Sequence, residues 1–132
     1  MGIARKRIQP KGLHDPSRYS HGIMAQPGKI LFIAGQTALD EKGTIVGQDD
    51  IEVQTTQVLE NLSAVLHEAG GSFANIVKTT TYITDIEYRE GLNRVRARYF
   101  EKNPPASTLV VVKGLARREF MVEIEAIAIL EG

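Results

Sequence analysis

Residues 104–130 read PPASTLVVVKGLARREFMVEIEAIAIL and contain the two patterns that decide the fold. The first pattern, at residues 108–112, is an almost continuous run of apolar and β-branched side chains. Such a run is typical of a strand covered on both faces, because a half-buried strand alternates. The second pattern, at residues 121–130, does alternate, and it predicts a strand that turns one face to the core.

Glu123 and Glu125 stand two residues apart in the second pattern, so both carboxylates emerge from the same face of that strand. Burying a carboxylate is unfavourable unless it is hydrogen-bonded or paired. Carboxylates in such a setting therefore often mark a catalytic site, an ion pair or a subunit contact. The alternative is that one or both are solvated at a sheet edge, and the pattern alone leaves both interpretations open.

Length and composition narrow the class of protein. The 132 residues predict a single domain, residues 1–132, that is long enough to bury a core. Sixteen basic and sixteen acidic residues give a formal net charge of zero, which argues against nucleic-acid and membrane partners. The chain has no cysteine, and His14, His21 and His67 show no metal-ligand spacing, so we expect no metal and no cofactor. No run approaches the about 20 apolar residues of a membrane span, and no signal-peptide pattern is present, so a soluble cytoplasmic protein is expected.

Periodicity and turn residues predict eight elements in the order βββαβαββ. These are strands at residues 3–8, 19–25 and 30–34, a helix at 49–69, a strand at 76–83, a helix at 85–100, and strands at 108–112 and 122–130. Asp49 or Asp50 is the candidate cap of the first helix. On the second helix Arg94, Arg96 and Arg98 are expected to be mostly solvated. The order points to one mixed sheet with both helices on one face, which is an α+β domain.

The other face of this sheet has no predicted cover within the chain. The run at residues 108–112 nevertheless has the composition of a doubly covered strand. Self-association through the sheet is the simplest way to cover it. A site built on that face would then lie between subunits.

Five short motifs together resemble one family. They are YS at residues 19–20, AGQ at 34–36, QVLENL at 57–62, KTTTYITD at 78–85 and VEIEAIA at 122–128. Their order and spacing resemble the Rid family, the YjgF-like reactive intermediate deaminases that are also called endoribonuclease L-PSP. The resemblance spans residues 19–130. It implies a chorismate-mutase-like fold and a homotrimer with clefts between neighbouring subunits. It also implies hydrolysis of 2-imino or enamine acids, such as 2-aminoacrylate, to 2-keto acids and ammonia.

The resemblance also implies which residues form the site. Tyr19 and Glu123 match the catalytic positions, and the substrate-binding positions are Ala34, Gly35, Asn93, Ser107 and Thr108. The family places an arginine that clamps the substrate carboxylate where this chain has Ser107. A guanidinium fork holds a carboxylate bidentately, so a serine cannot replace it. Arg18, Lys113 and Arg117 are the candidates for a replacement charge, and on this evidence Ser107→Arg should raise hydrolysis of 2-aminoacrylate.

Three functions follow as hypotheses. The first is a trimeric deaminase acting on a small imine or enamine whose acid group is bound differently or is absent. The second is a non-catalytic homotrimer that binds a small metabolite in its clefts. The third is an endoribonuclease, which is the weakest because the chain has zero net charge and no catalytic histidine pair.

Overall fold

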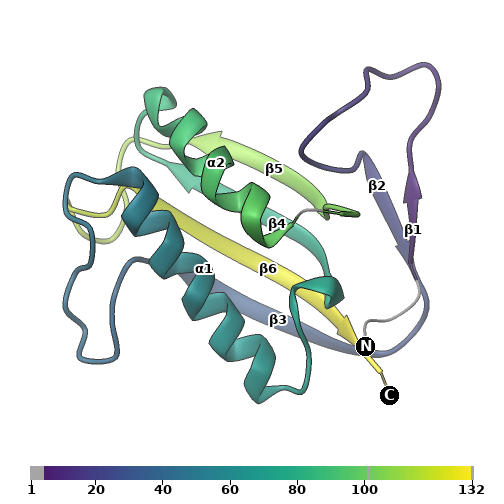
Figure 1. Ribbon diagram of the computed structural model, residues 1–132, viewed down its shortest axis with the longest axis horizontal. Coiled ribbons are helices and arrows are strands. Elements are labelled where there is room, and N and C mark those ends of the chain that lie inside the picture. The colour runs from purple at the N-terminus through teal and green to yellow at the C-terminus, as the bar shows by residue number, and fades with distance from the viewer. Residues whose placement is uncertain (1–4, 101, 132) are drawn as a thin grey trace.

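A four-stranded mixed sheet forms the centre of the computed structural model, which describes residues 5–100 and 102–131 (Figure 1). Its strands lie in the order β3 (Lys29–Gln36), β6 (Val122–Leu130), β4 (Ile76–Ile83) and β5 (Ala106–Val111). β6 pairs antiparallel with both β3 and β4, whereas β4 and β5 are parallel. The predicted order of strands and helices is confirmed, and two short 3₁₀ helices, η1 (Phe73–Asn75) and η2 (Ile86–Tyr88), are added to it.

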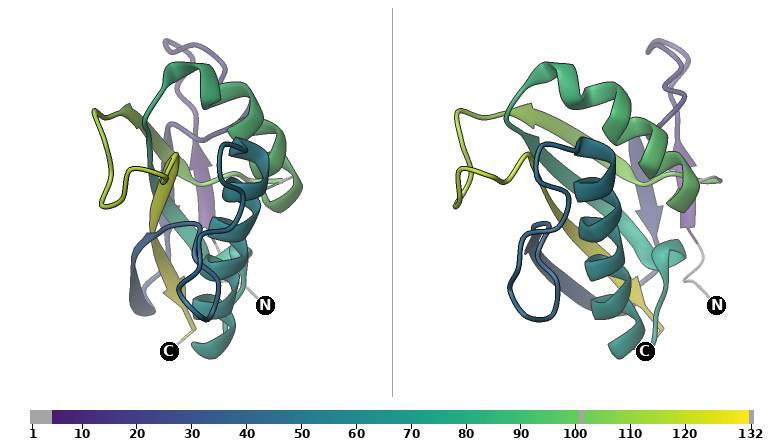
Figure 2. Two further views of the ribbon diagram at one scale, coloured as in Figure 1. Left: turned by 90° about the vertical axis from the view of Figure 1, so that its left-hand side faces the viewer. Right: turned by 60° about the vertical axis from the view of Figure 1, so that its left-hand side comes forward.

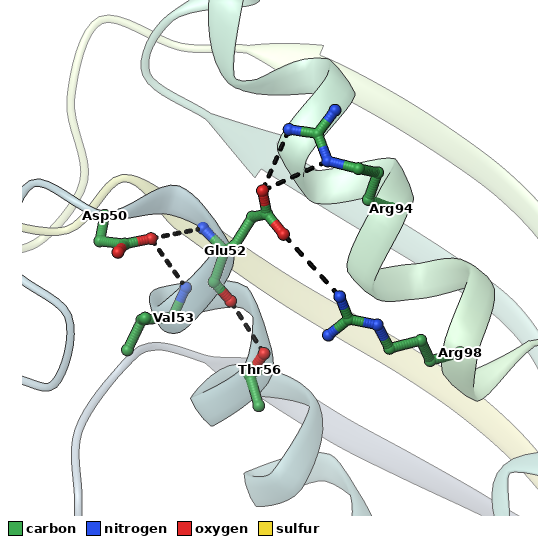
Figure 3. Close-up of polar contacts among 6 residues, drawn as sticks. All are labelled: Asp50, Glu52, Val53, Thr56, Arg94 and Arg98. Carbon is green, nitrogen blue, oxygen red and sulfur yellow. Dashed lines mark hydrogen bonds and ion pairs between the residues drawn. The ribbon is translucent and has the colours of Figure 1, made fainter.

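Two helices, α1 (Ile51–Glu68) and α2 (Arg89–Tyr99), cover one face of the sheet and leave the other face open (Figure 2). Asp50 caps α1 as predicted, because its carboxylate accepts hydrogen bonds from the backbone amides of Glu52 and Val53 (Figure 3). Gly70 follows the helix with a φ of +85°, which a glycine adopts without steric strain. Asp85 caps η2, the 3₁₀ turn that leads into α2.

The core lies between the helices and the sheet. Every second residue of β6 is buried there, against the inner stripe of α1, which comprises Val58, Leu59, Leu62 and Leu66. Gln54 is buried in the same stripe, which the apolar pattern did not predict. Its side chain donates to the carbonyl of Glu119 and accepts from the amide of Met121, so it fixes the connection that leads into β6.

The prediction of one continuous sheet is wrong at the N-terminus. β1 (Arg5–Ile8) and β2 (Gly22–Ala25) form a separate two-stranded antiparallel ribbon. The cause is visible just before β2, where the amide of Ser20 donates to Pro105 and its hydroxyl donates to Pro104. This part of the chain therefore pairs with the start of β5 rather than with β3. Residues 3 and 4 of the first predicted strand lie outside the described residues.

β5 is an edge strand, and the prediction that it is covered on both faces does not hold within one chain. Leu109, Val110 and Val111 remain partly exposed. The open face of the sheet is also apolar at β3, where Ile30 is exposed and Phe32 is 73% exposed. In the described part of the chain no helix combines the length and the hydropathy that crossing a bilayer requires.

Candidate functional site

A cleft of about 670 Å³ lies at the edge of the sheet, between β5, α2 and the loop that precedes β2. Tyr19 reaches it from the loop and Asn93 from α2, while Ser107 and Thr108 reach it from β5. Four of the seven residues that the family resemblance implies are thus brought together in one chain. The β-ribbon at the N-terminus gives Tyr19 its position beside β5.

Tyr19 is held from both of its ends. Arg7 donates to the Tyr19 carbonyl at 3.1 Å and to the hydroxyl of Ser20 at 2.7 Å. The Tyr19 hydroxyl is hydrogen-bonded to His14 Nε2 at 2.7 Å. His14 in turn packs edge-on against His21, whose ring nitrogen is hydrogen-bonded to the His14 carbonyl. The pairing of His14 with Tyr19 could not be predicted from the spacing of the histidines, which indicated neither a metal site nor a catalytic histidine pair.

Ser107 turns toward the helices. Its hydroxyl shares a hydrogen bond of 2.9 Å with the hydroxyl of Thr79 on β4. A guanidinium nitrogen of Arg96, on α2, donates to both hydroxyls, at 3.2 Å to Thr79 and 3.4 Å to Ser107. The guanidinium carbon also lies 5.2 Å from the centre of the Phe100 ring, a cation–π distance. An arginine side chain from the helix therefore contacts Ser107, the position at which the resemblance implies an arginine on the strand.

The prediction that Arg96 is mostly solvated is wrong, since Arg96 is only 7% exposed. Successive side chains on a helix are rotated by about 100°, so Arg96 lies roughly opposite Arg94 and Arg98. Those two arginines do remain exposed, and both approach the carboxylate of Glu52 on α1 (Figure 3). Burial lowers the pKa of Arg96 to about 10, so its guanidinium is still charged at neutral pH.

The three replacement charges considered from the sequence lie in different places. Arg18 lines the cleft. Lys113 and Arg117 are exposed on the connection between β5 and β6, and neither is among the residues that line the cleft. Arg117 instead lies over the ring of Phe120.

Glu123 lies on the open face of the sheet, directly over Gly35. A Cβ atom on Gly35 would lie 2.0 Å from Glu123 Oε2, so only a glycine leaves room for this carboxylate. The register between β3 and β6 shifts between Ile33 and Gln36, which places Ala34 and Gly35 in an irregular stretch beside Glu123. The group that approaches Gly35 most closely is thus the Glu123 side chain.

Glu123 and Glu125 are not equivalent. Glu125 is exposed and accepts a hydrogen bond of 2.7 Å from the Tyr82 hydroxyl on β4. This hydrogen bond raises the pKa of the Tyr82 phenol, which therefore stays a neutral donor. Glu123 is half-buried, and within residues 5–100 and 102–131 no side chain or backbone group donates a hydrogen bond to its carboxylate. Of the two carboxylates, that of Glu123 is the one without a hydrogen-bond donor among the described residues, so all of its acceptor sites are open to water or a ligand.

One chain does not unite the predicted site. Ser107 points toward the helices, whereas Glu123 and Glu125 emerge from the opposite face of the sheet. The residues that line the cleft do not include Ala34, Gly35 or Glu123. In the part of the chain that the structure describes, no group of histidine, aspartate and glutamate side chains has the geometry to hold a metal ion.

Comparison with known proteins identifies close relatives over nearly the whole chain. Residues 12–130 match the family model described as Endoribonuclease L-PSP. A RutC family protein of Pyrococcus horikoshii is 42% identical over 113 residues, which cover 86% of this chain and 87% of the relative. Protein DfrA of Myxococcus xanthus is 37% identical over 131 residues, covering 96% of this chain and 97% of its own. Among solved structures, this chain is similar to YyfB of Yersinia pestis, which is described as a member of the conserved Rid protein family. The two superimpose with a TM-score of 0.88 at 36% sequence identity, and the match covers 96% of this chain and 98% of YyfB.

Proposed function

Because this chain belongs to the endoribonuclease L-PSP family, which includes the Rid proteins, we propose that it is a deaminase. It hydrolyses a small imine or enamine to a carbonyl compound and ammonia, and it works as a homotrimer whose sites lie between subunits. The family match alone does not specify the reaction. The observation that carries the proposal is the state of the Glu123 carboxylate.

Glu123 has the properties that a water-handling carboxylate needs. It is half-buried, it has no hydrogen-bond donor among the described residues, and a glycine lies beneath it. A half-buried carboxylate with a purely structural role is normally paired or hydrogen-bonded. An unpaired carboxylate can act as a general base that takes a proton from water and later returns it.

The reaction needs that proton movement and no redox step. Water oxygen forms a bond to the imine carbon while the carbon–nitrogen π pair moves to nitrogen. Glu123 takes the water proton and delivers it to nitrogen. This gives a carbinolamine, and Glu123 next carries the proton of its hydroxyl group to the amino nitrogen. The carbon–nitrogen bond then breaks with its electron pair going to nitrogen, ammonia leaves, and the oxygen forms the carbonyl group. The Tyr19 hydroxyl, held by His14, orients the substrate from the other wall of the site.

A site shared between two subunits explains why the cleft residues and Glu123 lie apart in one chain. The cleft with Tyr19 and Asn93 lies at the β5 edge, whereas Glu123 lies on the open face of the sheet. A second copy that packs on this apolar face brings either its Glu123 to the cleft of the first chain or its cleft to the Glu123 of the first chain. Burial of Phe32 and Val110, both exposed in a single chain, supplies the driving force for this assembly.

The test is ammonia release from freshly generated imines and enamines, with the assembly confirmed by sedimentation equilibrium. We expect Glu123→Gln to keep the trimer and lose most of the turnover. Glu125→Gln is the matched control, because it makes the same change two residues along the same strand and should have a much smaller effect. Equal losses in both variants would show that the carboxylate has been assigned wrongly.

A non-catalytic, metabolite-binding trimer is the second candidate. It is favoured by the lining of the cleft, to which one chain contributes Tyr19, Asn93 and Ser107 but not Glu123. This candidate predicts saturable binding of a small ligand with no ammonia release from any substrate in the panel. It also predicts that Glu123→Gln leaves that binding unchanged.

A further inference from the structure

Arg96 is a buried cation without a matching anion. Its guanidinium meets only the neutral hydroxyls of Thr79 and Ser107, and its Nε is buried with no hydrogen-bond acceptor. In residues 5–100 and 102–131 the ion pairs are those of Arg94 and Arg98 with Glu52, and none involves Arg96. The charge nevertheless borders an open space, since Arg96 lines both the cleft and an adjoining hollow of about 90 Å³.

Such an arrangement is unfavourable for the protein alone. Removing a guanidinium from water carries a large desolvation penalty, which a protein normally offsets with a carboxylate and further hydrogen bonds. Two hydroxyls and an aromatic ring orient the group but do not neutralise it. A buried, oriented and uncompensated charge beside a cleft has the electrostatic properties of a ligand site.

We propose that Arg96 is the anchor for the carboxylate of a small monocarboxylic ligand that occupies this cleft. The charged side chains of the cleft favour a single negative charge, because Arg18, Arg89 and Arg96 are opposed by Asp15 and Glu90. The planar fork of an arginine suits a planar carboxylate. The small Ser107 side chain leaves the space through which the guanidinium reaches from α2 to the strand.

The position of Arg96 narrows the class of substrate that this cleft can bind. The loss of an arginine from β5 suggests a substrate without a standard acid group, whereas Arg96 restores a clamp from the helix. The substrate is therefore an imine or enamine that bears a carboxylate. That conclusion rests on the proposed deaminase function, but the anion site itself does not, and the two can be tested separately.

Binding of pyruvate and pyruvamide, measured by calorimetry on the assembled protein, tests the site without requiring turnover. The two probes have nearly the same shape and differ in charge. We expect pyruvate to bind clearly more tightly than pyruvamide. Arg96→Met removes the charge and keeps an apolar stem against Phe100, and it should weaken pyruvate binding roughly 30-fold or more. Arg98→Met is the matched control, because it removes an exposed charge two residues away on the same helix and should leave binding unchanged.

Stability gives a second readout that separates a ligand anchor from a structural residue. If Arg96 serves the ligand, Arg96→Met should not lower the melting temperature, because it removes an uncompensated buried charge. Pyruvate should raise the melting temperature of the wild-type protein but not that of the variant. If Arg96→Met does not fold, Arg96→Lys keeps the charge but not the fork, and it should still prefer pyruvate to pyruvamide with reduced affinity.

Other results of these experiments would reject the anion site or the deaminase function. Equal affinity for pyruvate and pyruvamide, or unchanged pyruvate binding in Arg96→Met, overturns the anion site. Dissociation of the assembly in Arg96→Met also overturns it, since Arg96 would then neutralise a carboxylate of a neighbouring chain. Arg96-dependent pyruvate binding without ammonia release from any substrate would keep the anion site and reject the deaminase.

Discussion

Replacing Gly35 with alanine tests whether the position of the Glu123 carboxylate controls turnover. The new Cβ would lie 2.0 Å from Glu123 Oε2, whereas ordinary contacts begin at 3.4 Å, so the oxygen must retreat by about 1.4 Å. Displacing a catalytic group by about 1 Å can lower the rate about 100-fold. We therefore expect kcat/KM of Gly35→Ala to fall by about two decades on any imine or enamine that the wild-type protein hydrolyses.

The same substitution should hardly change stability. The atoms that must move, Cγ, Cδ and Oε2 of Glu123, all belong to one flexible side chain, and Gly35 is not among the glycines with positive φ. A Gly→Ala change at a compatible backbone position even stabilises a protein by about 0.4–1 kcal/mol through the unfolded state. The free energy of unfolding should thus stay within about 1 kcal/mol of the wild-type value. Gly114→Ala is the control, because a Cβ there would meet no atom within 4 Å.

The double variant Gly35→Ala/Glu123→Gln identifies the route of the effect. If the alanine acts by displacing the carboxylate, the double variant should be no slower than Glu123→Gln alone, since the displaced group is already inactive. Ammonia release and urea unfolding would be measured on all four proteins. Full turnover in Gly35→Ala, or additive losses in the double variant, would refute the link between this glycine and catalysis.

Three further perturbations address other parts of the molecule. Phe32→Asp places a charge on the open sheet face, where Phe32 is 73% exposed, and should therefore prevent assembly through that face. Sedimentation equilibrium of the variant should then give the 14.6 kDa mass of a single chain, whereas that mass for the wild-type protein would reject the trimer. Asp50→Ala removes the acceptor for two backbone amides and should lower the free energy of unfolding in urea by about 1 kcal/mol, whereas an unchanged value would mean that the cap contributes nothing. From the sequence alone, Ser107→Arg is expected to raise hydrolysis of 2-aminoacrylate, but the position of Arg96 beside Ser107 reverses that expectation: a second guanidinium should weaken pyruvate binding, and adding Arg96→Met to the same chain should restore it. Tighter binding in Ser107→Arg alone would contradict a working clamp at Arg96.

Much of the fold could be predicted because each element has a strong local signal. The alternation in β6 assigned its inner face correctly, and the apolar stripe of α1 lies in the core. Asp50 and Gly70 bound α1 as their capping chemistry predicts. These signals are local, since they depend on residues within one or two turns of the chain.

Strand pairing in the first quarter of the chain could not be predicted in the same way. Whether residues before β2 join β3 or β5 depends on long-range backbone donors and acceptors that carry no sequence pattern. The amide of Ser20 finds the carbonyl of Pro105, 85 positions away along the chain numbering, and the ribbon of β1 and β2 follows that contact. The same pairing brings Tyr19 to Ser107, so the part of the fold that was predicted wrongly is the part that assembles the cleft.

The exposure of Arg96 was predicted wrongly even though the sequence contained a usable signal. Arg94 and Arg98 stand four residues apart and share one face, whereas Arg96 stands four residues after the buried Leu92 and must face the sheet with it. What the helix pattern could not supply is the partner, because Thr79 and Ser107 come from two separate strands. In the sequence, Ser107 and Arg96 look unrelated, because Ser107 lies on a predicted strand and Arg96 is one of several helix charges. In the folded chain, the small Ser107 side chain leaves the volume that the Arg96 guanidinium fills, so these two positions act as one unit. A substitution at either position should therefore be interpreted only with the residue at the other.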